Sequence, residues 1–141
     1  MQASAFAPNM NRLSVSLVDE DPAVRRSLQL LLRSANYEVR AYATAKALLA
    51  DPGALGSACL ITDWDMPTFD GLELLRHVRG QGWNAPAILM TSSKQPGLEL
   101  LATDAGFQAL LIKPLIDRVV LETVRSAIDR GVTALAPKSA G

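Results

Sequence analysis

The most informative segment of the chain reads Cys59-Leu60-Ile61-Thr62-Asp63-Trp64-Asp65-Met66-Pro67-Thr68-Phe69-Asp70-Gly71. It starts with an apolar run that predicts a buried strand, passes through a turn rich in carboxylates, and restarts as a helix at Asp70. Asp63 follows directly after the predicted strand. Because a carboxylate at the end of a buried strand is costly unless a partner stabilises its charge, we expect Asp63 to have a specific role.

The composition of the chain predicts one globular domain. Its 141 residues are 49% hydrophobic and 20% charged, and 14 basic residues balance 14 acidic ones. This composition argues against disorder, and the lack of a basic excess argues against direct nucleic-acid binding. We find no signal-peptide pattern and no apolar run of the roughly 18 residues that a membrane helix needs, so we expect a cytoplasmic protein without membrane contact. The single cysteine, Cys59, is expected to fill the core.

Five apolar runs predict strands, at residues 13–18, 37–41, 59–62, 85–90 and 109–112. A helix is expected after each strand, with Asp21, Thr44 and Asp70 at the first three N-termini. The last helix is expected to end at Arg130-Gly131. Short connections between alternating strands and helices are typical of an α/β fold, in which helices cover both faces of a parallel sheet. We therefore predict a flavodoxin-like, doubly wound (βα)5 fold, with five parallel strands in the order 2-1-3-4-5.

The predicted elements occupy residues 13–130, which we expect to form the single domain. Residues 1–12 show no hydrophobic period, and residues 131–141 leave no room for another domain. Both ends of the chain are therefore expected to be tails.

Polar residues follow four of the predicted strands at their carboxyl ends. They are Asp19 and Glu20 after the first strand, Asp63 and Asp65 after the third, Thr91 after the fourth and Lys113 after the fifth. In an open parallel sheet these ends lie on one edge, and ligands bind where the strand order reverses, here between strands one and three. Crowded carboxylates repel one another unless a cation is present, and oxygen ligands suit Mg²⁺, with Mn²⁺ as an alternative. A metal, carboxylates, a lysine and a hydroxyl together indicate phosphoryl transfer to Asp63.

The motifs of the chain resemble the receiver domain of bacterial two-component response regulators. They are Val18-Asp19-Glu20-Asp21, Thr62-Asp63-Trp64-Asp65-Met66-Pro67, Asp70-Gly71-Leu72-Glu73-Leu74-Leu75, Met90-Thr91 and Lys113-Pro114. Each motif alone is weak evidence, but together they occur in the order of the family and cover about residues 13–130. The run from Val18 to Leu28 is most similar to receivers of the nitrogen-fixation regulator type.

The resemblance implies how the acidic residues act. Asp63 matches the aspartate that accepts the phosphoryl group. Glu20, Asp63 and the backbone carbonyl of Asp65 match the ligands of Mg²⁺. Asp19 matches an acidic partner that usually binds the metal through a water molecule.

Other positions match residues that act on the phosphoryl group. The resemblance implies that the Thr91 hydroxyl moves to meet this group and that Lys113 contacts it. It also implies a cis peptide bond between Lys113 and Pro114. Asp65 and Ser93 match variable positions that tune the lifetime of the phosphoryl group.

A receiver of this kind takes its phosphoryl group from a sensor histidine kinase or a histidine phosphotransfer protein. We expect no enzymatic activity beyond self-phosphorylation and self-dephosphorylation. No DNA-binding module follows residue 130 in the sequence, so we expect output by contact with a protein partner rather than with nucleic acid. The expected contact face combines the helix after Gly97, the strand at residues 109–112 and the last helix, in a monomer or a phosphorylation-dependent dimer.

Three positions depart from the pattern of the family. Glu20 stands where aspartate is commoner, and its longer side chain should still reach the metal. Leu110 stands where the family often has a tyrosine or phenylalanine that turns inward when Thr91 moves, and Leu115 replaces the usual phenylalanine. These changes leave the phosphorylation chemistry intact, but the usual aromatic relay to the contact face is missing.

Two other functions compete with a phosphorylated receiver. The missing aromatic at Leu110 suits a degenerate receiver that binds a partner constitutively. Asp63-Trp64-Asp65 is also similar to the nucleophile motif of haloacid-dehalogenase-type phosphatases. Those enzymes carry the motif on their first strand and need a larger chain, whereas here it follows the third strand.

Simpler structural roles compete with single assignments. Asp19 and Glu20 could only complement a helix dipole, Lys113 could be a solvated strand-end residue, and Thr91 an ordinary turn residue. Asp70 is expected to cap a helix rather than bind a ligand.

Four further residues receive no chemistry from the sequence. Arg25 and Arg26 are expected on a solvated helix face or on a docking surface for a kinase. His77 falls in the middle of a predicted helix, away from any strand end, and is expected on the surface. Trp64 follows Asp63 in a loop and is expected to report occupancy of the site by its fluorescence.

Overall fold

A computed structural model of the chain describes residues 12–66 and 69–140, with side chains as far as residue 131. The predicted N-terminal tail lies outside the described residues apart from Arg12, as do Pro67 and Thr68 of the opening motif. The elements are β1 (Ser14–Val18), α2 (Pro22–Ser34), β2 (Glu38–Tyr42), α3 (Ala45–Leu49), the 3-10 helix η1 (Pro52–Gly56), β3 (Cys59–Asp63), α4 (Gly71–Gly80), β4 (Ala87–Thr91), α5 (Leu98–Ala105), β5 (Ala109–Ile112) and α6 (Asp117–Ala140).

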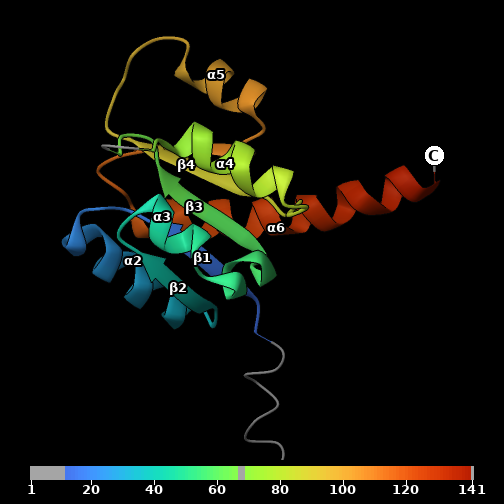
Figure 1. Cartoon of the computed structure of the whole chain (residues 1–141), viewed down its shortest axis with the longest axis horizontal. Helices are drawn as coiled ribbons and strands as arrows, with labels where there is room; N and C mark the ends of the chain where they lie inside the picture. The colour runs from blue at the N-terminus through green and yellow to red at the C-terminus, as the bar shows by residue number, and fades with distance from the viewer. Residues whose placement is uncertain (1–11, 67–68, 141) are drawn as a thin grey trace, which may run out of the picture.

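The five strands form one parallel sheet in the order β2-β1-β3-β4-β5, which confirms the predicted flavodoxin-like topology (Figure 1). Every residue of β3 and β4 is buried, as expected for central strands that have helices on both faces. Among the helices of the described residues, none is long and apolar enough to cross a membrane.

Two hydrophobic clusters lie on opposite faces of the sheet. On one face, α2 and α6 pack through Leu28, Leu32, Val120 and Val124 against Val15, Leu17, Ile61, Ile88 and Met90. On the other face, α3, α4 and α5 pack through Leu48, Leu74, Leu75, Val78 and Ala102 against Val18, Leu60 and Leu89. Because alternate strand residues point to opposite faces, both clusters draw on the same central strands. The central strands are thereby held between two layers of helices.

The helix starts confirm the residues that the sequence assigned to them. Asp21 caps α2 by accepting a hydrogen bond from Ala23 N, and Thr44 caps α3 by accepting one from Ala47 N. Asp70 and Glu73 form a capping box at the start of α4, in which each side chain accepts a hydrogen bond from the backbone of the other. The Asp70 carboxylate is therefore occupied in starting α4.

The predicted end of the last helix at Arg130-Gly131 is wrong, since α6 continues to Ala140 through the residues expected to form a tail. A glycine ends a helix when it adopts a left-handed conformation, as Gly106 does with φ 106° after α5. Gly131 remains helical, and a Cβ atom there would lie 3.2 Å from Cδ of Pro86. The absent side chain thus permits close packing of α6 instead of ending it.

Gly71, the first residue of α4, lies directly against the end of β3. A Cβ atom at this position would lie 2.7 Å from the backbone oxygen of Asp63 and 2.9 Å from Cδ1 of Leu89. The backbone of α4 can approach the strand end only because residue 71 has no side chain.

We predict that Gly71→Ala lowers the free energy of unfolding by about 1–3 kcal/mol, the usual range for overpacking in a core. Gly80→Ala is the matched control at the other end of α4, because a Cβ atom there would meet nothing within 4 Å. We expect this variant to be as stable as the parent chain or more stable. Urea unfolding of both variants makes the comparison, and equal stability of the two would contradict close packing at Gly71.

Candidate functional site

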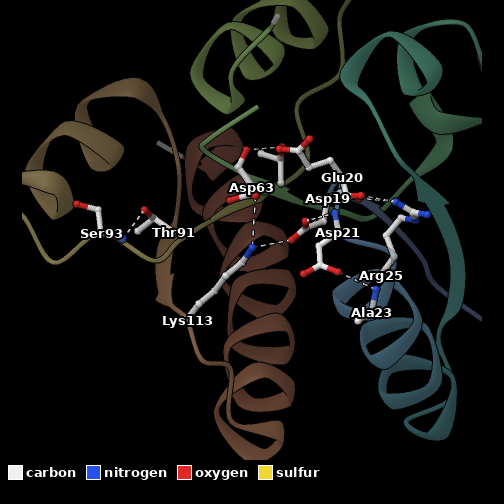
Figure 2. Close-up of polar contacts among 10 residues, drawn as sticks. Asp19, Glu20, Asp21, Ala23, Arg25, Asp63, Thr91, Ser93 and Lys113 are labelled. Atoms are coloured by element: carbon white, nitrogen blue, oxygen red, sulfur yellow. Dashed lines mark hydrogen bonds and ion pairs between the residues drawn. The ribbon is translucent and has the colours of Figure 1, made fainter. Parts of the chain in front are cut away.

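The carboxyl ends of four strands meet at one edge of the sheet. Asp19 follows β1, Asp63 ends β3, Thr91 ends β4 and Lys113 follows β5 (Figure 2). The strand order reverses between β1 and β3, so Asp19 and Asp63 flank the point where ligands bind in open α/β sheets.

Lys113 joins the two acidic residues. Its Nζ lies 2.8 Å from Oδ2 of Asp19 and 3.3 Å from Oδ2 of Asp63 (Figure 2). Asp19 is fully buried and Asp63 is 7% exposed, so neither carboxylate is stabilised mainly by water. The backbone N–H of Lys113 donates to the carbonyl of Thr91 at 2.7 Å. This hydrogen bond fixes the backbone of Lys113 beside the end of β4. Its peptide bond to Pro114 is cis, as the resemblance implies.

The charges of this cluster do not balance. Burial raises the pKa of Asp63, and the neighbouring charge of Asp19 raises it further, so the ammonium of Lys113 only partly offsets the shift. Burial alone would lower the pKa of Lys113, but its hydrogen bond to Asp19 and the charges of both carboxylates outweigh burial and raise it. Two buried carboxylates thus share one ammonium. The negative charge that Lys113 does not neutralise would attract a second cation.

Asp19 is held from both of its oxygens. Oδ2 accepts from Lys113, and Oδ1 accepts a hydrogen bond from the backbone N–H of Asp21 at 2.9 Å. Asp21 caps α2 with its own side chain, so the start of this helix and the orientation of Asp19 depend on each other.

Thr91 is fully buried at the end of β4. Its Oγ1 accepts a hydrogen bond from the backbone N–H of Ser93 at 3.0 Å (Figure 2). A hydroxyl that accepts one hydrogen bond in this way can still donate its own hydrogen.

The remaining predicted site residues lie at the rim. The side chains of Glu20 and Asp65 are exposed beside the buried pair of carboxylates. Within residues 12–66 and 69–131, no three His, Cys, Asp or Glu side chains are arranged to hold a metal ion. The structure therefore brings Asp19, Asp63 and Lys113 into contact, and within its described residues it shows no hydrogen bond or ion pair from the side chains of Glu20, Asp65 or Thr91 to Asp63.

The donor set nevertheless fits a divalent cation. The buried carboxylates of Asp19 and Asp63 exceed the charge of Lys113, and all nearby acidic ligands offer oxygen. Mg²⁺ prefers oxygen ligands, keeps several waters and needs only one or two protein carboxylates. Glu20 follows β1 and Asp65 follows β3, and both are exposed, so the Glu20 side chain and the Asp65 backbone carbonyl are candidates to complete such a site.

The sequence missed one residue of this region, Arg25. Its side chain is half-buried, and Nη1 donates to the backbone carbonyls of Asp19 at 2.8 Å and of Glu20 at 3.2 Å (Figure 2). Arg26 beside it is exposed, as expected for a solvated helix face. Arg25 and Arg26 are neighbours on the same predicted helix, so the sequence does not distinguish them. They differ because Arg25 reaches the loop between β1 and α2, whereas Arg26 is exposed.

Three residues that the sequence singled out lie outside this cluster. Cys59 is buried in the core, and burial raises the pKa of its thiol to about 12, so it is not a reactive thiolate. His77 is exposed on α4, and its ring meets that of Phe69 edge-on. Leu110 is half-buried and packs against the cluster beneath α4 and α5.

The fold and the site define a doubly wound α/β domain with an acidic, lysine-bridged edge at its topological switch point. The family model of the response regulator receiver domain matches residues 15–125. The chain therefore belongs to the response-regulator receiver family and is a receiver domain of two-component signalling.

Individual relatives agree with this family. The chain is 35% identical over 118 residues to the transcriptional regulatory protein FixJ of Azorhizobium caulinodans, which covers 84% of this chain and 56% of the relative. It is 32% identical over 114 residues to the response regulator protein TmoT of Ectopseudomonas mendocina, which covers 81% of this chain and 52% of the relative. The chain thus spans little more than half the length of these curated relatives.

Solved structures show the same fold. The crystal structure of FixJ-N is similar with a TM-score of 0.74 at 30% identity, and the match covers 84% of this chain and 95% of that one. A CheY-like receiver domain from Methanospirillum hungatei has a TM-score of 0.80 at 25% identity, over 88% of this chain and 99% of that one. The predicted fold and family are both confirmed.

The raised pKa of Asp63 predicts how its charge affects stability with pH. The folded chain binds this proton at a higher pH than the unfolded chain, so the stabilisation from protonation is complete below the unfolded pKa and is lost as the pH rises through the folded pKa. We therefore expect Asp63→Asn to be more stable than the parent chain at pH 7 without metal, and this gain to shrink as the pH falls toward about 4.

Urea unfolding at a series of pH values measures this difference. Asp104→Asn removes an exposed carboxylate from α5 and controls for loss of one negative charge. A destabilised Asp63→Asn at pH 7 would show that the attraction of Lys113 exceeds the burial and the repulsion by Asp19.

Proposed function

We propose that Asp63 accepts a phosphoryl group from a phosphohistidine on a sensor histidine kinase or a histidine phosphotransfer protein. The observation that carries this proposal is the shared contact of Lys113 with Asp19 and Asp63 at the switch point of a receiver domain. We propose that residues 13–130 form this receiver domain and that it acts in the cytoplasm, as expected from the sequence.

In the proposed reaction a carboxylate oxygen of Asp63 attacks phosphorus. The new bond joins this oxygen to phosphorus, the bond from phosphorus to the imidazole nitrogen of the donor breaks, and that nitrogen keeps the electron pair. Lys113 already lies 3.3 Å from Asp63 Oδ2, close enough for its ammonium to neutralise the incoming phosphoryl oxygens. The same ammonium holds Asp19, so the two acidic residues remain aligned as the charge at Asp63 changes.

We propose Mg²⁺, with Mn²⁺ as an alternative, as the cation of this site. Asp63, Glu20 and the backbone carbonyl of Asp65 would bind it directly, and Asp19 through a water molecule. When bound, such a cation supplies positive charge to the phosphoryl oxygens during transfer. The excess of negative charge around Lys113 supports this assignment.

Thr91 is proposed to contact the phosphoryl group after transfer. Its Oγ1 accepts from Ser93 N and keeps its hydrogen available for a phosphoryl oxygen. Ser93 holds this loop, and Asp65 is exposed beside Asp63, so both are placed where they would change access of water to the phosphoryl group. We propose that they tune its lifetime.

We propose output through the face formed by α5, β5 and α6. Exposed apolar side chains gather on these elements and the turn that joins the last two: Leu100, Leu101, Ile112, Ile116 and Val119. Apolar side chains at the surface of this kind suit a protein partner or a second copy of the chain after phosphorylation. Leu110 is half-buried on β5, at the position where the family often has the aromatic side chain that relays the movement of Thr91.

We predict that a small-molecule phosphodonor with Mg²⁺ adds one phosphoryl group to the chain and that Asp63→Asn abolishes the labelling. Lys113→Met should slow the labelling by about 100-fold, because one charged group that stabilises the transferred phosphoryl is lost. His77→Asn is the matched control, since His77 is exposed on α4 and far from this chemistry in the proposal. Intact-mass spectrometry measures all four proteins, and undiminished labelling of Asp63→Asn would contradict the assignment.

A degenerate receiver that binds its partner constitutively is the second candidate. It is favoured by Leu110 and by the lack, within the described residues, of three acidic, His or Cys side chains already arranged for a metal. Titration with MgCl2 separates the two, because Trp64 is half-buried next to Asp63 and should change its fluorescence when a cation binds. No response at millimolar metal together with no labelling would favour the degenerate receiver, whereas turnover of a phosphate ester would favour a phosphatase.

A further inference from the structure

Arg25 has contacts that distinguish it from the other basic residues of α2. Its Nη1 donates to two consecutive backbone carbonyls, those of Asp19 at 2.8 Å and Glu20 at 3.2 Å. The side chain comes from the first turns of α2 and reaches back over the loop that joins β1 to this helix (Figure 2). Arg26, the next residue, is exposed.

The two carbonyls lie where the sheet stops supporting the backbone. β1 ends at Val18, and the N–H of Asp19 still pairs with the carbonyl of Tyr42 at 3.1 Å. Arg25 supplies a donor for the Asp19 carbonyl beyond this last contact of the strand, where a buried residue requires one. The guanidinium of Arg25 therefore holds the backbone at Asp19 and Glu20, beyond the last hydrogen bond of the sheet.

The same loop carries the proposed cation ligands. The side chain of Asp19 contacts Lys113, and the side chain of Glu20 projects at the rim of the site. Groups that form hydrogen bonds to metal ligands commonly influence the affinity for the metal, because they fix the orientation of the ligands before binding.

We infer that Arg25 is a positioning residue for the cation site. It fixes the loop backbone from which the side chains of Asp19 and Glu20 would reach a cation at Asp63. This inference rests on the proposed Mg²⁺-dependent function.

The sign of one effect tests the inference. If Arg25 acted only as a positive charge near the site, its removal would strengthen binding of a divalent cation, because like charges repel. If it acts as a clamp on the two carbonyls, its removal weakens binding, because Asp19 and Glu20 lose their orientation. Removal of Arg26 takes away the same charge one residue further along α2 without touching the carbonyls.

The experiment compares Arg25→Met with Arg26→Met in the full chain. MgCl2 is titrated while the backbone amide chemical shifts of residues 19–21 and 63–65 are followed by NMR. We expect Arg25→Met to weaken Mg²⁺ binding by about tenfold, the lower end for loss of a group that orients metal ligands. Arg26→Met should bind within about twofold of the parent chain, as expected for an exposed charge in salt.

Thermal unfolding without Mg²⁺ separates positioning from a merely structural role. A structural role alone would lower the unfolding temperature of Arg25→Met and leave the Mg²⁺ affinity of the folded protein equal to that of Arg26→Met, which would overturn the inference. Tighter binding by Arg25→Met would overturn it as well.

The test also covers a variant that does not fold and a parent chain that does not bind Mg²⁺. If Arg25→Met does not fold, Arg25→Gln replaces it, since its amide nitrogen ends two bonds short of Nη1, and equal affinity to the parent chain would then overturn the inference. If the parent chain itself shows no Mg²⁺ response, the proposed function fails, and this result is distinct from a parent chain that binds and an Arg25→Met variant that binds equally well.

Discussion

One ammonium shared by two buried carboxylates is the interaction on which this site depends. Lys113 lies between Asp19 and Asp63, which come from strands β1 and β3 on either side of the topological switch point. Burial of charged carboxylates is costly, and one lysine cannot neutralise both of them. Burial and the neighbouring charge of Asp19 raise the pKa of Asp63, and a divalent cation would relieve both effects. The structural requirement and the proposed chemistry thus have the same electrostatic origin.

The surrounding fold converts this cluster into a defined geometry. The central strands β3 and β4 are buried along their whole length, so packing between two layers of helices sets where their carboxyl ends lie. Gly71 lets α4 approach the carbonyl of Asp63, and the backbone of Lys113 is tied to Thr91. The rim residues Glu20 and Asp65 are exposed and free of this packing, which suits side chains that must adapt to a ligand. A defined position for Asp63 and Lys113 is what transfer of a phosphoryl group requires.

Much of this could be predicted because the relevant signals are local. Hydrophobic runs gave the strands, and Asp21, Thr44 and Asp70 marked helix starts because capping involves residues only two or three apart. The end of α6 was mispredicted because glycine has two uses, a left-handed stop and a close contact, and the contact of Gly131 with Pro86 is distant in the sequence. Trp83 follows α4 in a loop, yet it is buried and its Nε1 donates to the carbonyl of Ser57, a partner that is distant in the sequence.

The order of strands and helices, the family, and the polar residues that follow four of the strands could all be read from the sequence, because periodicity and motif spacing are properties of neighbouring residues. Which of those polar residues touch one another depended on how distant segments pack. It joined Asp19, Asp63 and Lys113, left Glu20 and Asp65 at the rim, and separated Arg25 from Arg26. The physical reason is that hydrogen bonds and charge pairs depend on distances of about 3 Å between atoms, and packing of remote segments sets those distances.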